Sequence, residues 1–473
     1  MEPAFAIVVD IGKTLSKVSW WSRTGALLAR ETRANARVEE DGIARLDARG
    51  IGDWLLAVLA ARPAPAAEFL IPVAHGAGVA ALREGALVLT PLDYEAAPPA
   101  SLLARYRAGR DAFAETGSPA LPQGLNLGAQ LAWMEALDPA GLAGATLLPW
   151  AQYWAWFLSG AAVSEVTSLG CHSDCWAPFA GDFSAMAIRR GWARRFARRA
   201  RADAVVGTLR PDIARRTGLS PAVKVLAGLH DTNAALLAAR GALGPGEASV
   251  LSTGTWFIAL RLGEAATAPL PEARDCLVNV DIAARPVPSA RFMGGREIAA
   301  LIGEGVGEGV GEGGLAVDAP ADQPRLLAAA EAVLAAGALP LPTLAPGCGP
   351  FPQGVPRWLA EPVDRDSRRA AACLYAALVA DVSLGCIDAR ARLLIEGRFA
   401  RAEVFTRALA ALRPDLAVDA AARDNDVSFG ALRLVLPALA PPGGLRRIAP
   451  LAPDLAAHRA RWQAAIASQR SAA

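Results

Sequence analysis

Lysine and histidine are scarce in this chain of 473 residues. Lysine occurs at Lys13, Lys17 and Lys224, and there are four histidines, so arginine carries most of the positive charge. The formal net charge is +2. A chain with so little excess charge has no large field of one sign to attract nucleic acid or an acidic membrane surface. The charge balance therefore favours small neutral or phosphorylated ligands.

Long apolar runs and a dense set of cysteines are also missing. No stretch reaches the ~20 uninterrupted apolar residues of a membrane span, and the start, MEPAFAIVVD, lacks the pattern of a signal peptide. Six cysteines in so long a chain do not resemble the disulfide framework of a small secreted domain, so we expect reduced thiols. These absences predict a cytoplasmic protein without a membrane partner.

Two local patterns allow both a functional and a structural interpretation. CHSDC, residues 171–175, has no second Cys/His pair at zinc-site spacing, so we expect a packed loop rather than a metal site. The arginine-rich segment 187–203 places Ile188, Trp192 and Phe196 four residues apart. This spacing predicts an amphipathic helix with a solvated arginine face rather than a helix that binds nucleic acid.

A strand, turn and strand pattern occurs twice, roughly 240 residues apart, which indicates two related domains. The first copy is AFAIVVDIG followed by KVSWW, and the second is ASVLSTGTWFIALRL at residues 248–262. Between them, RGALGPGEA at residues 240–248 has the glycine and proline of a linker. We therefore place one domain at 1–240 and a second at 241–473.

Strands and helices are mixed along both predicted domains, which indicates an α/β fold. Residues 325–336 and 367–380 predict core helices, and 452–470 predict an amphipathic C-terminal helix on the second domain. GEGVGEGVGEGG, residues 303–314, is too rich in glycine for a helix or packed strand. We therefore expect a surface loop there. A phosphate-binding glycine loop is the alternative, but its glutamates would repel phosphate.

The two turns have the composition of phosphate-binding loops. DIGKTLSK, residues 10–17, supplies an acid, small hydroxyl side chains, a glycine and two of the three lysines. STGTW, residues 252–256, again has hydroxyl groups and a glycine but no bulky side chain before its tryptophan. An ordinary polar hairpin is the alternative for either turn alone. Neither fits the P-loop pattern, and no dinucleotide-binding G-x-G-x-x-G follows a strand.

Four blocks in this order resemble the FGGY carbohydrate kinases. They are DIGKTLSK, GLHDTNAALLAA at 228–239, SVLSTGTW at 249–256 and LLIEGRFARAEVF at 393–405. The segments HGAG, GLNLGAQLAW and QYWAWFLSGAAVSEVTSLGCHSDCW further resemble the branch that contains rhamnulokinase and fuculokinase-like proteins. The resemblance spans about residues 6 to 436.

The resemblance implies two RNase H-like domains of the actin, Hsp70 and sugar kinase superfamily, with the active site in an interdomain cleft. It also implies a phosphotransferase that uses ATP and Mg²⁺ and has an alcohol group as acceptor. Phosphoryl transfer to a sugar needs an aligned hydroxyl, a carboxylate to receive its proton, and cations around the transferring group.

Asp231 matches the catalytic aspartate of the family, which implies a general base. A helix cap is the alternative, because an aspartate before TNAALLAA also suits an N-cap. Sugar contacts are implied for His75, Gln152, His230 and Thr232, with Tyr153 as a weaker candidate. A structural role is the alternative for His75.

Asp10 matches the residue that acts on magnesium, through water. The residues implied to face the nucleotide are Gly12, Lys13, Thr14, Thr253, Gly254 and Thr255 at the phosphates and Gly397 at the adenine. Two residues depart from the family pattern. Lys13 stands where many relatives have a small residue, and Arg398 replaces the second glycine of the adenine-side pair. Arg398 would either stack on the base or obstruct it.

The resemblance implies an ATP-dependent kinase of a small ketose, of the L-rhamnulose or L-fuculose type with a 1-phosphate product. A pentulose 5-kinase of the xylulose or ribulose type is the alternative, as is a non-catalytic, sugar-sensing member of the fold. The resemblance also allows a homodimer.

Overall fold

The structure, a computed structural model, describes residues 2–264, 269–303, 317–423, 426–452 and 454–472. These residues form two compact units. The first comprises Met1–Gly241, Val278–Pro286 and Asp426–Pro441, and the second Ala242–Leu277, Val287–Asn425 and Pro442–Ala473. The first crossing between units lies one residue from the expected boundary, but two later segments return to the first unit. The expected glycine-rich loop lies, from residue 304 onward, outside the described residues.

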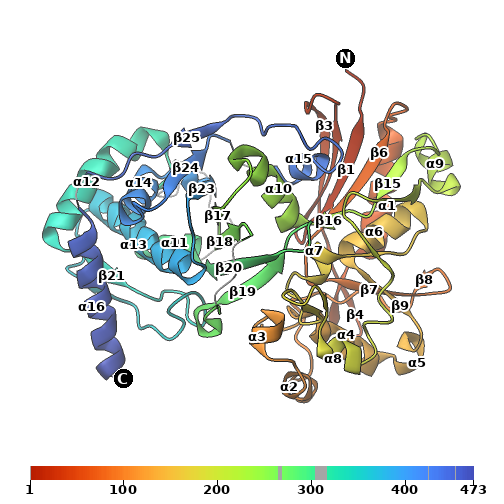
Figure 1. Cartoon of the computed structure of the whole chain (residues 1–473), viewed down its shortest axis with the longest axis horizontal. Coiled ribbons are helices and arrows are strands. Elements are labelled where there is room, and N and C mark those ends of the chain that lie inside the picture. Colours follow the sequence, from red (N-terminus) through yellow and green to blue (C-terminus); the bar gives the residue numbers. More distant parts are fainter. Residues whose placement is uncertain (1, 265–268, 304–316, 424–425, 453, 473) are drawn as a thin grey trace. The chain divides into compact units, whose positions relative to one another are not determined.

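The first unit is built on a sheet with the strand order β14-β15-β6-β1-β2-β3, in which β16 also pairs with β6 (Figure 1). Its elements are β1 Ala6–Ile11, β2 Leu15–Trp21, β3 Leu27–Ala34, β4 Arg37–Glu40, β5 Ile43–Leu46, α1 Ala48–Ala61, β6 Phe69–Ala74, β7 Val79–Arg83, β8 Ala86–Leu87, α2 Ala100–Ala108, α3 Phe113–Thr116, α4 Leu127–Leu137, α5 Pro139–Leu142, β9 Thr146–Pro149, α6 Trp150–Ser159, β10 Ser164–Glu165, α7 Val166–Leu169, β11 Trp176–Ala177, β12 Asp182–Phe183, α8 Ala185–Arg189, β13 Arg199–Ala200, β14 Val205–Thr208, α9 Pro211–Thr217, β15 Lys224–Leu226, β16 Leu229–His230, α10 Asp231–Leu243 and α15 Val427–Leu432.

Strand β1 is buried on both of its faces. Ile7, Val9 and Ile11 pack in one apolar cluster with residues of α1 and α6. Ala6 and Val8 point the other way and pack with residues of α10 and α15. Because successive side chains of a strand face opposite sides, the continuous apolar run AIVV is what a strand covered on both faces requires. The cover from α15 explains why residues 426–441 return to the first unit.

The second unit repeats this plan with the strand order β19-β20-β18-β17-β23-β24-β25. In each unit the first strand lies between an antiparallel partner, β2 or β18, and a parallel partner, β6 or β23. The elements are β17 Ala248–Thr253, β18 Phe257–Leu262, the short 3₁₀ helix η1 Glu272–Arg274, β19 Cys276–Val280, β20 Pro286–Phe292, α11 Gly294–Ile302, η2 Pro320–Asp322, α12 Gln323–Ala336, β21 Leu339–Leu341, β22 Arg357–Leu359, α13 Arg365–Cys386, β23 Arg392–Gly397, η3 Arg398–Arg401, α14 Glu403–Leu412, β24 Ala417–Ala421, β25 Leu445–Arg447 and α16 Ala456–Ala472. The two predicted strand, turn and strand patterns are therefore confirmed.

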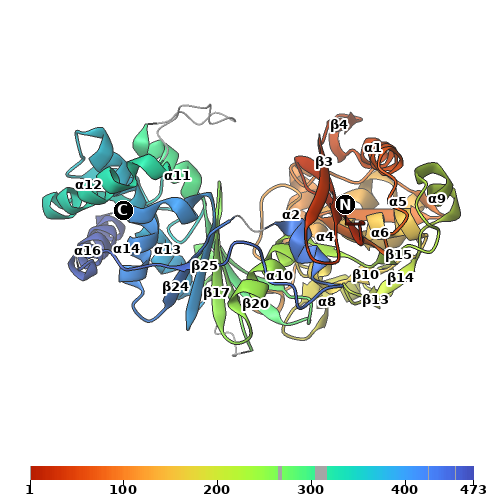
Figure 2. The ribbon, with the colours of Figure 1, turned by 90° about the horizontal axis from the view of Figure 1, so that it is seen from above.

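Helix α13 is the core helix of the second unit and lies beside α14 near β24 (Figure 2). Among the described residues it is the one helix long and apolar enough to cross a membrane. Its most apolar window is 78% buried inside the protein, which is typical of a core helix. The expected core helices at 325–336 and 367–380 correspond to α12 and α13.

The helix expected at 187–203 is wrong. Helix α8 ends at Arg189, and the chain continues through turns to the short strand β13. Trp192 and Phe196 are buried as expected, but Ile188 is exposed. Contacts with distant parts of the chain explain the difference, because the Trp192 indole donates to Glu135 and the Leu147 backbone donates to Arg195 O. These tertiary bonds replace those of a continuous helix.

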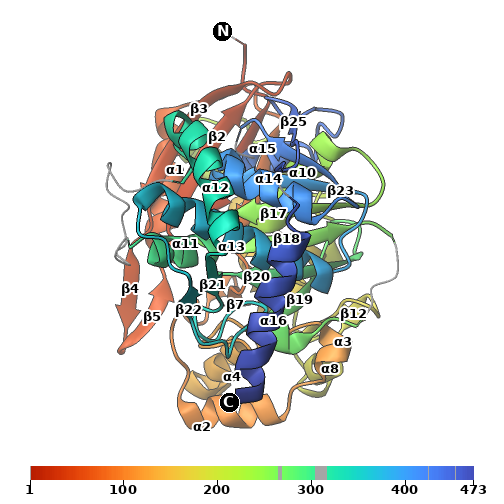
Figure 3. The same cartoon turned by 90° about the vertical axis from the view of Figure 1, so that its left-hand side faces the viewer.

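Helix α16 packs against β21 in the second unit, which confirms the expected C-terminal helix (Figure 3). Trp462 is fully buried, and its indole N–H donates to Pro340 O at 2.9 Å. Its ring lies edge-on to Phe351, with the centroids 5.4 Å apart.

Replacing Trp462 with Ala should lower the free energy of unfolding of the second unit by about 3–5 kcal/mol, because a large buried ring is lost and Pro340 O loses its donor. Urea unfolding monitored by circular dichroism measures the change. Gln463→Ala, at an exposed position of the same helix, is the control and should change the value by less than about 0.5 kcal/mol. Equal stability of the two variants would show that α16 is not part of the folded core.

His458, on the same helix, predicts a pH effect on stability. Burial lowers the pKa of this imidazole from 6.5 to about 4. Its Nδ1 has no hydrogen-bond partner among the described residues. The unfolded chain binds the proton more readily, so this group's contribution is complete above pH 6.5 and is lost as the pH falls toward 4.

Between pH 7 and pH 5, wild-type protein should therefore lose about 2 kcal/mol more stability than His458→Gln. Urea unfolding of both proteins at the two pH values gives the comparison. The difference between them isolates His458 from other titrating groups. Parallel pH dependences of the two proteins would contradict the burial of a neutral imidazole.

Candidate active site

The first predicted phosphate turn is the tight connection between β1 and β2. Gly12 N–H donates to Leu15 O at 3.0 Å. A Cβ added at Gly12 would lie 2.8 Å from that oxygen, so a side chain does not fit there. Asn35 closes the turn from the end of β3, because its amide donates to Gly12 O at 2.8 Å and accepts from the Ser16 hydroxyl at 2.7 Å. Asn35 was not predicted as a site residue, because no local pattern in the sequence links it to a turn more than 20 residues earlier.

Asp10 lies at the end of β1 and is almost completely buried. Burial raises the pKa of its carboxyl to about 7. Lys17, whose Nζ is 3.7 Å from Oδ2, opposes this rise, whereas the negative charges of Asp231 and Asp426 add to it. The two candidate carboxylates, Asp10 and Asp231, therefore lie close enough for the charge of Asp231 to raise the pKa of Asp10. The positive charge of Lys17 does not fully offset this rise.

Lys13 points to an acidic pair in the first unit. Its ammonium forms an ion pair with Asp93, and Glu95 Oε2 lies 3.8 Å away. The same ammonium lies 5.2 Å from the centre of the Tyr94 ring. Thr14 is exposed at the tip of the turn, and its carbonyl accepts from Asn35 N–H. The Lys13 charge is thus largely neutralised within the unit.

His230 and Asp231 form the corner between β16 and α10. His230 is buried, and burial lowers the pKa of its imidazole, so the ring is neutral at pH 7. Its Nε2 lies 3.1 Å from Asp231 Oδ1 and 3.2 Å from Cys171 Sγ. The Asn233 amide nitrogen next to Nδ1 can only donate, which assigns the single ring proton to Nε2. Nδ1 then accepts from the Asn233 amide at 3.4 Å.

The two oxygens of Asp231 have different surroundings. Oδ1 accepts from Thr232 N–H at 2.5 Å and from the Thr232 hydroxyl at 3.3 Å, and His230 Nε2 lies 3.1 Å from it. Oδ2 has no hydrogen-bond partner among the described residues, and the side chain is 30% exposed. Asp231 is the first residue of α10. One oxygen is thus fixed while the other is left to accept a proton.

The remaining sugar candidates are partly structural. His75 is buried, and its Nδ1 lies 2.7 Å from Gly76 O; burial lowers the pKa of its ring. Gln152 is completely buried, and its amide donates to Ala227 O at 3.2 Å and Gly228 O at 3.3 Å. The Gln152 amide therefore supports the backbone of the segment that leads to His230. Tyr153 is also buried, stacked on Trp150.

The second predicted phosphate turn is braced by Thr253, at the end of β17. Its hydroxyl donates to Glu396 O at 2.6 Å and accepts from Phe399 N–H at 3.1 Å. Gly397 has φ +82°, and an added Cβ would lie 2.2 Å from Thr253 O. Position 397 therefore requires glycine twice over, by backbone conformation and by close approach.

Gly254 and Thr255 form the open part of this turn. A Cβ at Gly254 would meet no atom closer than 3.9 Å, and Thr255 is exposed. Gly295 N–H, in the first turn of α11, donates to Thr255 O at 3.2 Å. Arg398 is tied to Asp318, with its guanidinium nitrogens 3.1–3.3 Å from both carboxylate oxygens. This pairing turns the Arg398 charge toward Asp318.

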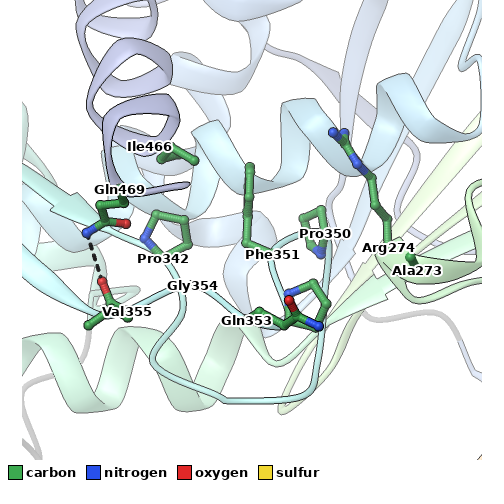
Figure 4. A pocket seen from close by; sticks show the side chains of 11 residues that line it. Ala273, Arg274, Pro342, Pro350, Phe351, Gln353, Gly354, Val355, Ile466 and Gln469 are labelled. Atoms are coloured by element: carbon green, nitrogen blue, oxygen red, sulfur yellow. Dashed lines mark hydrogen bonds between the residues drawn. The ribbon is translucent and has the colours of Figure 1, made fainter. Parts of the chain in front are cut away.

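A pocket of about 490 Å³ in the second unit contains none of these candidates (Figure 4). It lies between the loop around residues 342–355 and α16, where the Gln469 amide donates to Val355 O. The pocket lining consists of Ala273, Arg274, Pro342, Pro350, Phe351, Pro352, Gln353, Gly354, Val355, Ile466 and Gln469. Among the described residues, no group of three or more His, Cys, Asp or Glu side chains is arranged to hold a metal ion.

Comparison with known proteins identifies the family. The model of the carbohydrate kinase FGGY C-terminal domain matches residues 245–442. A carbohydrate kinase from Novosphingobium aromaticivorans has a solved structure with 57% sequence identity and a TM-score of 0.95, covering 99% of this chain and 100% of that chain. No curated protein matches the sequence.

Two more distant solved structures share the fold. Xylulose kinase from Rhodospirillum rubrum is 18% identical with a TM-score of 0.78, covering 98% of each chain. Gluconate kinase from Lactobacillus acidophilus is 12% identical with a TM-score of 0.78, covering 99% of this chain and 97% of that chain. The fold is that of the actin, Hsp70 and sugar kinase superfamily, and the narrower rhamnulokinase branch stays a prediction. The chain belongs to the FGGY family of carbohydrate kinases.

Proposed function

We propose that this kinase transfers the γ-phosphoryl group of ATP to a hydroxyl of a small, uncharged ketose, with Asp231 as the general base. The observation that carries the proposal is the asymmetry of the Asp231 carboxylate: Oδ1 accepts from the Thr232 N–H and hydroxyl, and Oδ2 has no hydrogen-bond partner among the described residues. A base fixed by one oxygen keeps its second oxygen in one direction, which suits it to receive the proton of an attacking hydroxyl.

The neutral His230 ring supports this role. Its Nε2 lies 3.1 Å from Oδ1, and because the ring is uncharged it does not remove the negative charge that a base needs. Thr232 adds a backbone and a hydroxyl donor from the first turn of α10. We therefore assign His230 and Thr232 to orienting Asp231, and Thr232, which is partly exposed, also to contacting the sugar.

Asp10 suits a role in magnesium binding. A buried carboxylate with its pKa raised to about 7, close to a second carboxylate, is stabilised by an added divalent cation. When bound, magnesium supplies positive charge to the phosphate oxygens of ATP. We assign the turns at Gly12 and Thr14 and at Gly254 and Thr255 to the phosphates.

The charges of the first unit favour a neutral sugar. Lys13 pairs with Asp93, and Lys17 lies beside Asp10. Burial keeps His75 and His230 uncharged. Each of these candidate cations is therefore neutralised, and a sugar carboxylate would find no unpaired positive partner among them.

Within the neutral ketoses, we propose a 1-phosphate product from a sugar of the L-rhamnulose or L-fuculose type. The support is the sequence resemblance of the HGAG and GLNLGAQLAW segments. A pentulose, the substrate named for the Rhodospirillum rubrum protein, is the second candidate.

Asp231→Asn should lower kcat by about 10²- to 10⁴-fold, because an amide cannot accept the proton of the attacking hydroxyl. The Michaelis constant for ATP should change little. An ADP-release assay with MgATP and a saturating ketose gives both values. Asparagine caps helices as well as aspartate does, so this change separates the base from a capping role.

Asp138→Asn is the matched control, because Asp138 caps the short helix α5 of the same unit and accepts from Gly141 N–H. It should retain wild-type kcat. If Asp231→Asn behaved like this control, the assignment of the general base would be wrong.

A substrate panel tests the charge argument. Wild-type protein should release ADP with neutral ketoses, first L-rhamnulose and L-fuculose and then D-xylulose and D-ribulose, and not with D-gluconate. The product is identified by ³¹P NMR, which distinguishes 1-phosphate from 5-phosphate. Turnover of gluconate above that of every ketose would refute the preference for an uncharged sugar.

A further inference from the structure

Glu165 and Thr167 form a buried polar pair beneath the Asp231 corner. Both side chains are completely inaccessible to solvent. Glu165 caps the short helix α7, where its Oε2 accepts from Thr167 N–H at 3.0 Å and Ser168 N–H at 3.3 Å. The same oxygen accepts from the Thr167 hydroxyl at 2.6 Å.

The carboxylate fixes the direction of the Thr167 hydroxyl. A threonine hydroxyl has one proton to donate and lone pairs to accept. Because its proton goes to Glu165, the oxygen is free to accept, and it does so from His230 N–H at 3.0 Å. Thr167 thus connects a buried acid to the backbone of the residue that precedes Asp231.

This bond lies where β16 ends and α10 begins. Strand β16 has two residues, Leu229 and His230, which pair with β6. Such a short strand holds the direction of the chain weakly on its own. The Thr167 bond ties the backbone at His230, which directly precedes Asp231, and His230 Nε2 lies 3.1 Å from Asp231 Oδ1.

Apart from the three bonds of Oε2, the Glu165 carboxylate contributes little to the structure. Its Oε1 has no hydrogen-bond partner, and the carboxylate forms no ion pair, within the part of the chain that the structure describes. Burial raises its pKa to about 7. A buried acid without a cation is costly, and its three donors all lie in α7, which presents Thr167 to His230.

We propose that Thr167 and Glu165 are positioning residues for phosphoryl transfer: Glu165 orients the Thr167 hydroxyl, and Thr167 fixes the backbone of His230 and so the direction of Asp231 Oδ2. This inference rests on the proposed role of Asp231 as general base. A carboxylate displaced by about 1 Å costs on the order of 10²-fold in rate, so a bond that holds the corner affects kcat.

Thr167→Val and Glu165→Ala should each lower kcat by about 10- to 100-fold, with the Michaelis constant for ATP within about twofold of wild type. Valine keeps the shape of threonine but leaves His230 N–H without an acceptor. Thr167→Ser keeps the hydroxyl, and Glu165→Gln keeps an oxygen that accepts from Thr167. Both conservative variants should retain kcat within about threefold. Two independent pairs are used so that one still decides if a member of the other fails to fold.

Thr217→Val is the matched control. Thr217 is also buried in the first unit, and its hydroxyl donates to Ile213 O at 2.8 Å and accepts from Leu219 N–H at 3.4 Å. Loss of this hydroxyl should leave kcat unchanged while lowering the melting temperature as much as Thr167→Val does. A general loss of stability is thereby separated from loss of positioning.

Hydrogen–deuterium exchange supplies a measurement that is independent of activity. The peptide containing His230 should exchange faster in Thr167→Val than in wild type, Thr167→Ser or Thr217→Val. Unchanged exchange, or wild-type kcat in both Thr167→Val and Glu165→Ala, would overturn the positioning role. Asp231→Asn is assayed in parallel: wild-type kcat in that variant would refute the proposed base itself, whereas an inactive Asp231→Asn with fully active Thr167→Val refutes the positioning role alone.

Discussion

Burial of the central strands on both faces is the constraint on which the rest of the structure depends. A strand such as β1, covered by α1 and α6 on one face and by α10 and α15 on the other, admits polar groups mainly near its end. The candidate residues lie at such ends. Asp10 is at the end of β1, His75 follows β6, and His230 ends β16. Because β6 is parallel to both β1 and β16, these ends lie at one edge of the sheet. In the second unit, parallel β17 and β23 bring Thr253 and Gly397 together in the same way.

Several negatively charged side chains lie at this edge of the sheet, and the neighbouring positive charges do not fully neutralise them. Burial and two neighbouring acids hold the pKa of Asp10 near 7 against the opposing Lys17. Burial holds the nearby His75 and His230 neutral, so they do not cancel the negative charge of the carboxylates. Such an arrangement is costly for the empty protein and favourable for a cation with its phosphates. The same physical terms connect the stability of the unit to the function proposed for it.

Much of the fold could be predicted from the sequence, because its strongest signals are local. The apolar runs before DIGK and STGT, the glycine-rich turns and the repeat of the whole pattern predicted β1, β2, β17 and β18. The helix expected at 187–203 failed because periodicity cannot show that Trp192 and the Arg195 backbone bond to distant partners. For the same reason, the sequence could not show that the Gln152 amide donates to the backbone at Ala227 and Gly228. Asn35 and Thr167 could not be found at all, since each acts on a residue remote in the sequence.

The residues that could carry the chemistry were identifiable from the sequence alone: an acid at position 231, hydroxyl and glycine turns at the start of each repeat, and a glycine at 397. The sequence also determined the family, since four short blocks in a set order carry more information than any one of them. The partners of those groups, by contrast, are set by the tertiary fold. It directed both Thr232 donors to Asp231 Oδ1, paired Lys13 with Asp93, and turned Arg398 toward Asp318. The physical reason is that hydrogen-bond direction, burial and charge pairing depend on neighbours that the order of residues along the chain does not specify.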